Sequence, residues 1–369
     1  MKIVADQAKL SQRLQAVGAV VPTKTTLAIL TNVLFQAEGE QLRLTATDLD
    51  MSLTTSMPVR VEQAGEVCVQ ARRIVEIVRS LSPGEVKLGA KADIVRIQCG
   101  KSDFRIKGAD SEEYPKVAER MKEKGFGIPG STLQHMIERV IHAVSQDLSR
   151  VSLTGVLWEL EKARFSMVAT DGSRLSKASR PEKLSAGVAS EVIVPGKALQ
   201  HLQRLMSGDA EVRIGVSESS IGFDLGDSFL HSRLLEGPFP NYRPVIPTAN
   251  KYKLTVEREG LSQATRRVAL LANTLTHQIK MGLRPDLVSL SVSTPDLGEA
   301  QEDIVAAYDG PEMDIGFNAN FLLDILKCMD SDDVEFALET PDTATMIRPV
   351  DGKEGEEYFC LLMPLRLAE

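Results

Sequence analysis

The chain has 369 residues, of which 43% are hydrophobic and 25% charged, and its formal net charge is −8. This composition is typical of a soluble globular protein with two or three domains, and no apolar run approaches the ~18 residues of a membrane span. The acidic balance argues against nucleic-acid binding unless the basic residues gather on one surface. Four scattered cysteines without a Cys-x-x-Cys pair predict reduced thiols in a cytoplasmic protein, with neither a zinc site nor a disulfide framework.

A helix followed by a hairpin recurs three times along the chain. The first helix is expected over residues 6–17, where apolar residues recur at helical spacing, and its hairpin turns at Gly39 between strands 32–35 and 42–44. The second and third copies have the same order. Their predicted helices and strands span residues 131–144, 156–158, 165–169, 261–271, 281–283 and 288–292. The helix at 131–144 is predicted to open with a Ser-x-x-Gln capping box.

Each copy continues with a second strand-helix unit, and here the agreement is tighter. Apolar residues recur at i, i+3 and i+7 in all three helices, as expected for one face packed on a sheet. They are Ile74, Ile77 and Leu81, then Leu199, Leu202 and Met206, then Leu322, Ile325 and Met329. Pro115, Pro240 and Pro364 follow these units at separations of 125 and 124 residues. An interval of this size indicates a triplicated unit.

We therefore predict an α+β fold of three repeated domains, each a doubled strand-helix-strands unit. The expected limits are 1–120, 126–245 and 246–369, with connectors near 117–125 and 243–250. The second connector contains Pro244 and Pro247, and such a segment is expected to be stiff and extended.

The stretch from Phe165 to Leu175 stands out within the second copy. Its first half alternates like a strand, with Phe165, Met167 and Ala169 on one face. Its Asp171-Gly172 pair is a turn signal that returns the following residues to the surface. Residues 42–48 show the same alternation and the same Ala-Thr-Asp ending.

The predicted helices are more basic than the rest of the chain. For this sum the helices are taken as residues 6–17, 72–81, 130–144, 197–206, 259–272 and 320–329. Together they carry a net charge of +6, which leaves −14 for the remainder. Lysine and arginine are good helix formers, so these could simply be solvated faces. Alternatively, the helices line one basic surface, which is what binding to a phosphate backbone requires. From the residues alone, both interpretations stay open.

The usual signatures of catalysis are missing from the sequence. It contains no phosphate-binding glycine loop, dinucleotide fingerprint or nucleophile elbow. Asp48 and Asp50 stand at a hairpin end, where a turn-forming role is expected. His135 and His142 could share a helix face, but surface histidines are expected rather than a metal site, and Ser173 has no histidine near in sequence to act as its base. We predict no catalytic residue, metal or cofactor.

Three strings resemble one known family. They are Ala-Thr-Asp-Gly-x-Arg-Leu at 169–175, Phe-Pro-x-Tyr at 239–242 and Met-Pro-Leu-Arg-Leu at 363–367. Together with the triplication, they resemble the bacterial DNA sliding clamp family, the beta subunit of DNA polymerase III. The resemblance runs from Met1 to Leu367 and includes residues 27–30 and 45–51.

This resemblance implies a non-catalytic processivity factor. Clamps of this family are head-to-tail homodimers of three-domain subunits, closed into a ring around double-stranded DNA with helices facing the hole. A heterologous contact whose rotation closes gives a ring rather than a fibre. The implied partners are the alpha subunit of DNA polymerase III, the clamp loader delta subunit, and other polymerases and repair proteins that carry clamp-binding peptides.

Family roles carry over to individual positions. The implied DNA contacts are Lys24, Arg72, Arg73, Arg79, Gln146, Lys197 and Arg204. The implied dimer contact joins Phe104 and Ile106 to Leu270 and Leu271, although ordinary domain core is an alternative for these four. The implied partner-peptide pocket contains Arg150, Leu153, Thr170, Gly172, Ser173, Arg174, Leu175, Pro240, Val245, Met346, Leu361, Leu362, Met363, Pro364, Leu365, Arg366 and Leu367.

This sequence departs from the family pattern in three places. Ser173 stands where a histidine is common, and Pro244 where an arginine is common, so hydrogen bonds at the pocket rim are expected to differ. Ala368 and Glu369 extend past the usual end and add a negative charge. Two other hypotheses are an enzyme that uses carboxylates of the Ala-Thr-Asp turns, and a repeat scaffold that binds peptides without touching DNA.

Overall fold

The structure is a computed structural model that describes residues 1–91, 93–118, 120, 125–182, 190–352 and 355–367. The predicted Ala368–Glu369 extension and most of the connector near 117–125 lie outside these residues. No helix in the described ranges is long and apolar enough to cross a membrane. Contacts divide the chain into two compact units, residues 1–134 with 197–234, and residues 135–196 with 235–369. These limits follow strand pairing between neighbouring repeats, and the three predicted domain limits stay a prediction.

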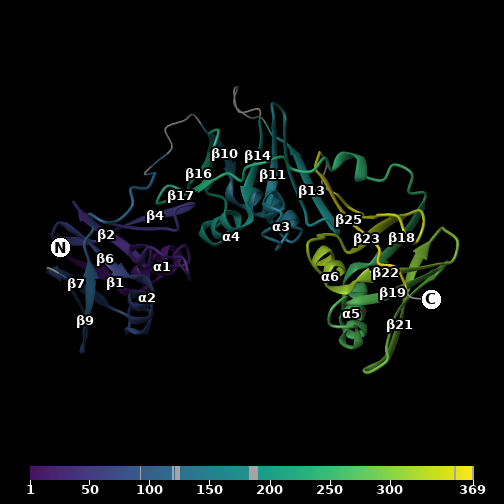
Figure 1. Cartoon of the computed structure of the whole chain (residues 1–369), viewed down its shortest axis with the longest axis horizontal. Helices are drawn as coiled ribbons and strands as arrows, with labels where there is room; N and C mark the ends of the chain where they lie inside the picture. Colours follow the sequence, from purple (N-terminus) through teal and green to yellow (C-terminus); the bar gives the residue numbers. More distant parts are fainter. Residues whose placement is uncertain (92, 119, 121–124, 183–189, 353–354, 368–369) are drawn as a thin grey trace. The chain divides into compact units, whose positions relative to one another are not determined.

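The first unit contains one antiparallel sheet of thirteen described strands, in the order β10-β15-β16-β17-β4-β3-β2-β6-β9-β8-β7-β1-β5. Helices α1 and α2 pack against each other, and α1 covers β3 and β4 (Figure 1). The strands are β1 Lys2–Asp6, β2 Asn32–Glu38, β3 Gln41–Thr47, β4 Met51–Pro58, β5 Arg60–Gln63, β6 Gly65–Gln70, β7 Glu85–Lys91, β8 Ile94–Cys99, β9 Ser102–Ala109, β10 Phe126–Pro129, β15 Glu211–Val216, β16 Ser220–Asp224 and β17 Ser228–Arg233. The helices are α1 Gln7–Gly18, α2 Ala71–Ser80 and, from its second residue, α4 Gly196–Leu205.

The second unit contains a sheet of twelve described strands, in the order β14-β11-β12-β13-β25-β24-β23-β18-β21-β20-β19-β22. Its helices α5 and α6 pack against each other, and α5 also contacts β20 and β21. The strands are β11 Gly155–Glu161, β12 Arg164–Thr170, β13 Arg174–Pro181, β14 Ser190–Pro195, β18 Tyr252–Glu257, β19 Gln278–Arg284, β20 Leu287–Thr294, β21 Gly298–Tyr308, β22 Met313–Asn318, β23 Asp333–Leu338, β24 Thr345–Pro349 and β25 Glu357–Leu362. The helices are the greater part of α3 Gly130–Ile141, with α5 Arg258–Val268 and α6 Ala319–Lys327.

The predicted repeat is confirmed. Hairpins β2–β3, β11–β12 and β19–β20 follow the first helix of each copy, and the turn between β2 and β3 uses Gly39 at φ +59°. In the second helices, the residues predicted by the i, i+3, i+7 spacing are buried except for Ile77, which is half-buried. In α2 the neighbouring Val78 is buried in its place. The fold class is therefore the predicted α+β repeat, with each copy a doubled strand-helix-strands unit.

One local expectation is wrong, and another is confirmed but incomplete. Helix α3 begins at Gly130, so Ser131 lies inside its first turn and its hydroxyl donates to Asp209 instead of capping the helix. Strand β12 is buried on both faces, because Ser166 and Val168 are enclosed along with the predicted apolar face. Simple alternation therefore describes only one side of this strand. The second side contributes to the candidate site.

Strand pairs join neighbouring repeats inside each unit. In the first unit β4 pairs with β17, so that Leu53 lies opposite Leu230. In the second unit β13 pairs with β25, so that Leu175 lies opposite Leu361. We call these two places the first junction and the second junction. Each turn that leads into a junction is one of the two Ala-Thr-Asp strings.

Candidate functional site

The turn between β12 and β13 is held by its own side chains. The hydroxyl of Thr170 donates to the carbonyl of Arg174 at 2.6 Å and accepts from the backbone N–H of Gly172 at 3.1 Å. The carboxylate of Asp171 accepts from the N–H groups of Ser173 and Arg174 at 2.8 and 3.0 Å. Gly172 has φ +94°, which only glycine adopts without strain. The Asp-Gly turn signal is thus confirmed, and the turn is rigid.

An apolar cluster forms one face of the sheet beside this turn. Except for Tyr242, which lies in the segment after β17, its core members come from β11, β12, β13, β14 and β25, which the strand register brings onto one side. They are Leu157, Val168, Leu175, Ile193, Tyr242, Phe359 and Leu361, with Leu235, Phe239, Ile246 and Met346 packed against them and partly buried. Two of these residues, Leu175 and Leu361, are predicted pocket residues that face each other across β13 and β25. Burial of such side chains is worth about 1.5–3 kcal/mol each.

A segment at residues 235–246 lies across the apolar cluster and is fixed by a buried polar group. The hydroxyl of Tyr242 donates to the carboxylate of Glu159 at 2.9 Å, and the guanidinium of Arg243 donates to the same carboxylate at 2.6 Å. Burial, followed by the charge of Glu159, raises the pKa of Tyr242 well above its ordinary value. Val245, in contrast, is 55% exposed. The segment is therefore held at its start, where the N–H of Leu235 donates to the carbonyl of Ile193 at 2.9 Å, and again at Glu159, and it leaves apolar surface open at its end.

The C-terminal tail leaves β25 beside the same turn. The N–H of Met363 donates to the carbonyl of Ser173 at 2.9 Å, and that of Leu365 donates to the carbonyl of Gly316 at 2.8 Å. A Cβ at Gly316 would lie 2.5 Å from the carbonyl oxygen of Leu365, so glycine is required for this close approach. The side-chain amide of Gln278 donates to the carbonyl of Arg366 at 2.9 Å. The tail is thus bound to the third repeat, as its apolar sequence predicts.

The other predicted pocket residues have different surroundings, and the side chain of Arg366 is exposed. Arg150 donates to Asp147 at 2.9 Å, and its guanidinium lies 3.1 Å from where a Cβ on Gly172 would stand. Leu153 and Leu362 are buried beneath the surface, whereas Ser173, Pro240 and Met363 are exposed around the cluster. Leu367 lines a separate open hollow of about 650 Å³ formed with residues of β19, β20 and β21. The remaining members, Met346, Pro364 and Leu365, are half-buried.

The predicted DNA contacts are polar and exposed. Lys24, Arg72, Arg73, Arg79 and Arg204 are exposed in the first unit, and Gln146 is exposed in the second. Lys197 is also exposed, but its ammonium donates to Asp48 at 2.6 Å. The observed helix bounds place Asp6 outside α1 and Arg258 inside α5. Both changes make the helices more basic than the predicted segments.

The predicted interface residues lie on strand β9 and on the turn η4, Ala269–Leu271. Phe104 and Ile106 are half-buried on β9 and line an open hollow of about 760 Å³. Leu270 is 79% exposed, and Leu271 is half-buried. A leucine this exposed gains little from the fold of its own unit and is available for contact with another surface.

The carboxylates and histidines that sequence reasoning set aside have structural partners. Asp48 accepts from the N–H groups of Asp50 and Met51 at 3.2 and 2.8 Å, which confirms its turn-forming role. Within the described ranges, no three His, Cys, Asp or Glu residues are grouped so as to hold a metal ion. His135 lies 3.5 Å from Asp330.

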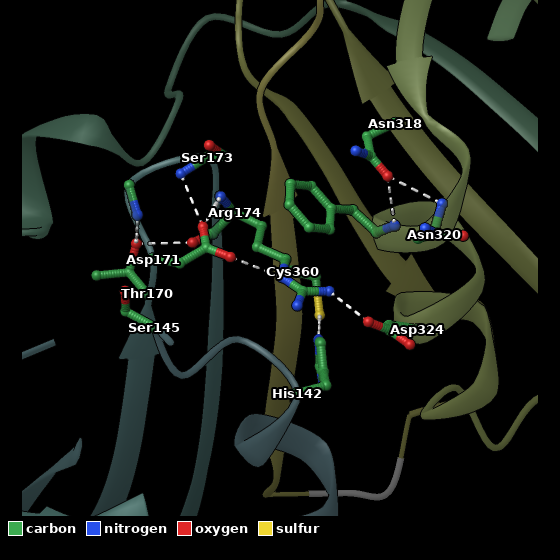
Figure 2. Close-up of polar contacts among 12 residues, drawn as sticks. His142, Ser145, Thr170, Asp171, Ser173, Arg174, Asn318, Asn320, Asp324 and Cys360 are labelled. Atoms are coloured by element: carbon green, nitrogen blue, oxygen red, sulfur yellow. Dashed lines mark hydrogen bonds and ion pairs between the residues drawn. The ribbon is translucent and has the colours of Figure 1, made fainter. Parts of the chain in front are cut away.

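His142 is not the surface histidine that was expected. Its Nδ1 lies 3.5 Å from the thiol of Cys328. Its Nε2 lies 3.9 Å from the thiol of Cys360, the contact drawn in Figure 2. Burial, followed by the charge of Arg174, lowers the pKa of His142 to about 4. Burial raises the pKa of Cys328 to about 12 and that of Cys360 to about 11, so both remain protonated thiols.

Sequence reasoning missed the side chains that hold the turn from outside. Asp324 on α6 accepts from Arg174 at 2.7 Å, and the ring of Phe321 lies under the same guanidinium. Nothing in the local pattern of α6 indicates this role. Glu159 could have been noticed, because it interrupts the otherwise apolar run of β11 and a charge in a buried strand needs a partner.

The class that this geometry defines is a repeat protein in which a turn held by its own hydrogen bonds lies beside a partly open apolar face. Comparisons with known proteins identify the family. Residues 1–118, 127–241 and 243–366 match the N-terminal, central and C-terminal domains of the DNA polymerase III beta subunit. The chain therefore belongs to the DNA polymerase III beta subunit family of bacterial sliding clamps.

Individual relatives agree along the whole length. The chain is 32% identical over 376 residues to the beta sliding clamp of Caulobacter vibrioides and covers all of both proteins. Its structure is similar to that of the Bartonella birtlesii sliding clamp bound to griselimycin, with a TM-score of 0.94, 32% identity and full coverage of both chains. It is also similar to the Pseudomonas aeruginosa clamp bound to griselimycin, with a TM-score of 0.92, 30% identity and full coverage of both chains.

Proposed function

We propose that this protein is a DNA polymerase processivity factor, a homodimeric ring that encircles duplex DNA and tethers its partners through the apolar cluster of the second junction. Family membership along the full chain carries the proposal. The protein would slide without sequence preference and contribute no chemistry of its own. Its place would be the cytoplasm, where bacterial DNA is replicated.

Two strand edges support a ring of two chains. Among the described strands, residues 102–107 of β9 pair only with β8, and residues 298–305 of β21 pair only with β20. An unpaired edge is a template for pairing with another chain. The first edge presents the exposed cations Arg105 and Lys107, and the second presents the exposed carboxylate of Asp303. A contact between these edges in different copies would be heterologous and could close a ring.

Diffuse phosphate attraction would hold the DNA. Helices α1, α2, α4 and α5 each carry more Lys and Arg than Asp and Glu, although the whole chain is acidic. Cations on helices neutralise phosphates without reading bases, so the duplex can move along its axis. The proposed contacts remain Lys24, Arg72, Arg73, Arg79, Gln146, Lys197 and Arg204.

The second junction would receive short peptides from partners. Exposed Val245 precedes the cluster residue Ile246, and exposed Met363 follows β25, which carries Leu361. The backbone of the 170–174 turn forms a fixed rim. An apolar surface with a few fixed polar groups is the usual design of a peptide site. The expected partners are the polymerase alpha subunit, the clamp loader delta subunit, and other polymerases and repair proteins. The position of Leu367 away from this cluster leaves its proposed contribution the least supported.

Retention on circular DNA tests the ring. The clamp, loaded on a nicked circle by a bacterial clamp loader, should stay bound and should be released when the circle is cut with a restriction enzyme. Salt should weaken this retention far less than it weakens ordinary phosphate binding. Equal retention on linear DNA would overturn the proposal, and so would a solution mass of one chain.

Charge reversal at Arg72, Arg73 and Lys197 separates the clamp from a scaffold that never touches DNA. Loading should fall in the clamp and stay unchanged in such a scaffold. Substitution of Asp48 and Asp171 by alanine tests the enzyme hypothesis, with a hydrolytic activity and processive synthesis as the two readouts. Loss of a hydrolytic activity with processive synthesis intact would favour an enzyme.

A further inference from the structure

Arg174 is enclosed by its neighbours instead of being open to a partner. Its side chain is only 9% exposed. Its Nε donates to Asp171 at 3.0 Å and its Nη1 donates to Asp324 at 2.7 Å. The guanidinium carbon lies 4.2 Å from the ring centroid of Phe321, a cation–π contact. Figure 2 shows Asp171, Arg174 and Asp324 in a row, from the turn on one side to helix α6 on the other.

Helix α6 offers a fixed support for this row. The side chain of Asn318 caps it by accepting from the N–H groups of Asn320 and Phe321 at 2.9 and 3.2 Å. Leu322 and Ile325 are fully buried on the face of the helix that packs on the sheet. Asp324 lies between them in sequence and is 48% exposed. Its backbone position is therefore set by the fold, whereas its carboxylate remains reachable by water.

The row continues into the rim of the apolar cluster. The carboxylate of Asp171 that pairs with Arg174 also accepts the N–H of Ser173. The carbonyl of Ser173 in turn accepts the N–H of Met363, the first residue of the tail. Each member fixes the next, so that α6, the turn and the tail share one chain of hydrogen bonds.

We call the apolar cluster of the second junction, together with the 170–174 turn, the docking face. We propose that Asp324 is a positioning residue for this docking face, and that it acts through Arg174 on the turn. This inference rests on the proposed peptide-docking function. In it, Arg174 does not donate to the bound peptide. Two of its five N–H donors, one on Nε and one on Nη1, are held by carboxylates, and its flat face lies against a ring. The orientation of the turn follows from that of the guanidinium.

Physical chemistry gives the expected effect of removing Asp324. A largely buried guanidinium held by two carboxylates loses half of its charge compensation when one of them is neutralised. Arg174 would then turn toward water or toward Asp171, and the turn would move with it. The apolar cluster would stay packed, because none of its members contacts α6 through Asp324. The defect should therefore appear in binding and much less in stability.

Asp324→Asn tests the proposal, with griselimycin as the probe because two related clamps have been solved with it bound. Binding of fluorescently labelled griselimycin to the full-length protein is measured by anisotropy. We expect affinity to fall roughly fivefold to twentyfold, with recovery in Asp324→Glu. Asp296→Asn, an equal charge change in an exposed turn, should leave affinity unchanged.

A double variant shows whether Asp324 acts through Arg174. If it does, Asp324→Asn combined with Arg174→Gln binds no more weakly than Arg174→Gln alone. Losses that add, or unchanged affinity in Asp324→Asn when Leu175→Ala loses binding, would overturn the inference. Failure of the unaltered protein to bind the probe, or binding that Leu175→Ala leaves intact, would instead count against the proposed docking site. Thermal unfolding of each variant identifies any that fails to fold.

Discussion

The two junctions contain the same turn with different surroundings. In both turns, residues 47–51 and 170–174, the threonine hydroxyl donates to the carbonyl four residues later, at 2.8 and 2.6 Å. In both, the aspartate carboxylate accepts the N–H groups two and three residues later. The carbonyl of Asp50 accepts the N–H of Arg233 at 2.8 Å, just as the carbonyl of Ser173 accepts that of Met363 at 2.9 Å. The backbone of a docking rim is therefore present twice.

The side chains separate the two junctions. In the first, the register places Ser52 opposite His231, where the second has Leu175 opposite Leu361. The helix contact also differs, because Asp48 pairs directly with Lys197 on α4, whereas the second turn reaches α6 through an arginine. A polar surface such as that of Ser52 and His231 gains little free energy when an apolar peptide covers it. The repeat thus gives both junctions the same backbone, and a few side chains decide which junction binds a partner.

The largest expected effect comes from truncating the side chain that follows each turn, Leu175 in the second junction and Ser52 in the first. Leu175→Ala should lower the free energy of unfolding by about 2–4 kcal/mol through the cavity that it leaves, and should weaken griselimycin binding roughly thirtyfold or more. Ser52→Ala, its counterpart in the first junction, should change neither by a measurable amount. Urea unfolding and anisotropy provide the two readouts. Equal losses of affinity in both variants would erase the distinction between the junctions.

Acid should destabilise each junction through an enclosed histidine. Burial lowers the pKa of His142 in the second unit to about 4, and that of His201 on α4 also to about 4. In the unfolded chain these histidines have a pKa near 6.5, so between pH 6.5 and 4 they bind protons that they do not bind in the folded protein. Stability is therefore complete above about pH 6.5 and falls as the pH drops toward 4, by roughly 3 kcal/mol for each fully titrated histidine.

Substituting one histidine at a time assigns this pH dependence. His142→Gln should flatten the fall of unfolding free energy between pH 6.5 and 4.5 by up to half, and His201→Gln should do the same. Denaturant unfolding at closely spaced pH values gives the slopes. A slope unchanged in both variants would mean that other groups produce the acid sensitivity.

The contact between the C-terminal tail and β22 can be disrupted without changing the turn or the apolar cluster of the second junction. Gly316→Ala would place a Cβ 2.5 Å from the carbonyl oxygen of Leu365, so the tail must move away from β22. We expect a cost of about 1–2 kcal/mol from the lost backbone hydrogen bond and strain, with weaker griselimycin binding. Gly352→Ala is the control, because no atom lies within 4 Å of the Cβ that it adds. Unchanged binding in Gly316→Ala would show that the tail is not part of the docking face.

Local pattern was enough to predict the repeat and the turns. Periodic apolar residues identified the helix faces at Ile74 and Leu199, and the Asp171-Gly172 pair identified the turn, because each depends on neighbours a few residues away. The floor of the docking face was harder to predict, since Val168 joins it only when the other side of β12 is covered. The Arg174–Asp324 contact joins segments that are remote in sequence, and only the register of β13 with β25 brings them together. Family resemblance supplied the list of pocket residues, including Arg174, but did not indicate that its guanidinium is paired with both Asp171 and Asp324.

The smallest effect concerns one backbone position shared by both turns. Leu49 has φ +79° where the second turn has Gly172 at +94°, so a leucine occupies a conformation that favours glycine. Leu49→Gly should relieve about 1 kcal/mol of strain and lose part of that gain to the greater freedom of the unfolded chain, for a net gain of about 0.5 kcal/mol. Gly172→Leu should cost at least as much as the strain, because its side chain would also meet the guanidinium of Arg150. Urea unfolding of the two variants measures the sign of the change in the free energy of unfolding for each. If Leu49→Gly destabilised the protein, the 52% exposed leucine would be contributing packing that the first turn needs, and the two turns would be equivalent in backbone geometry alone.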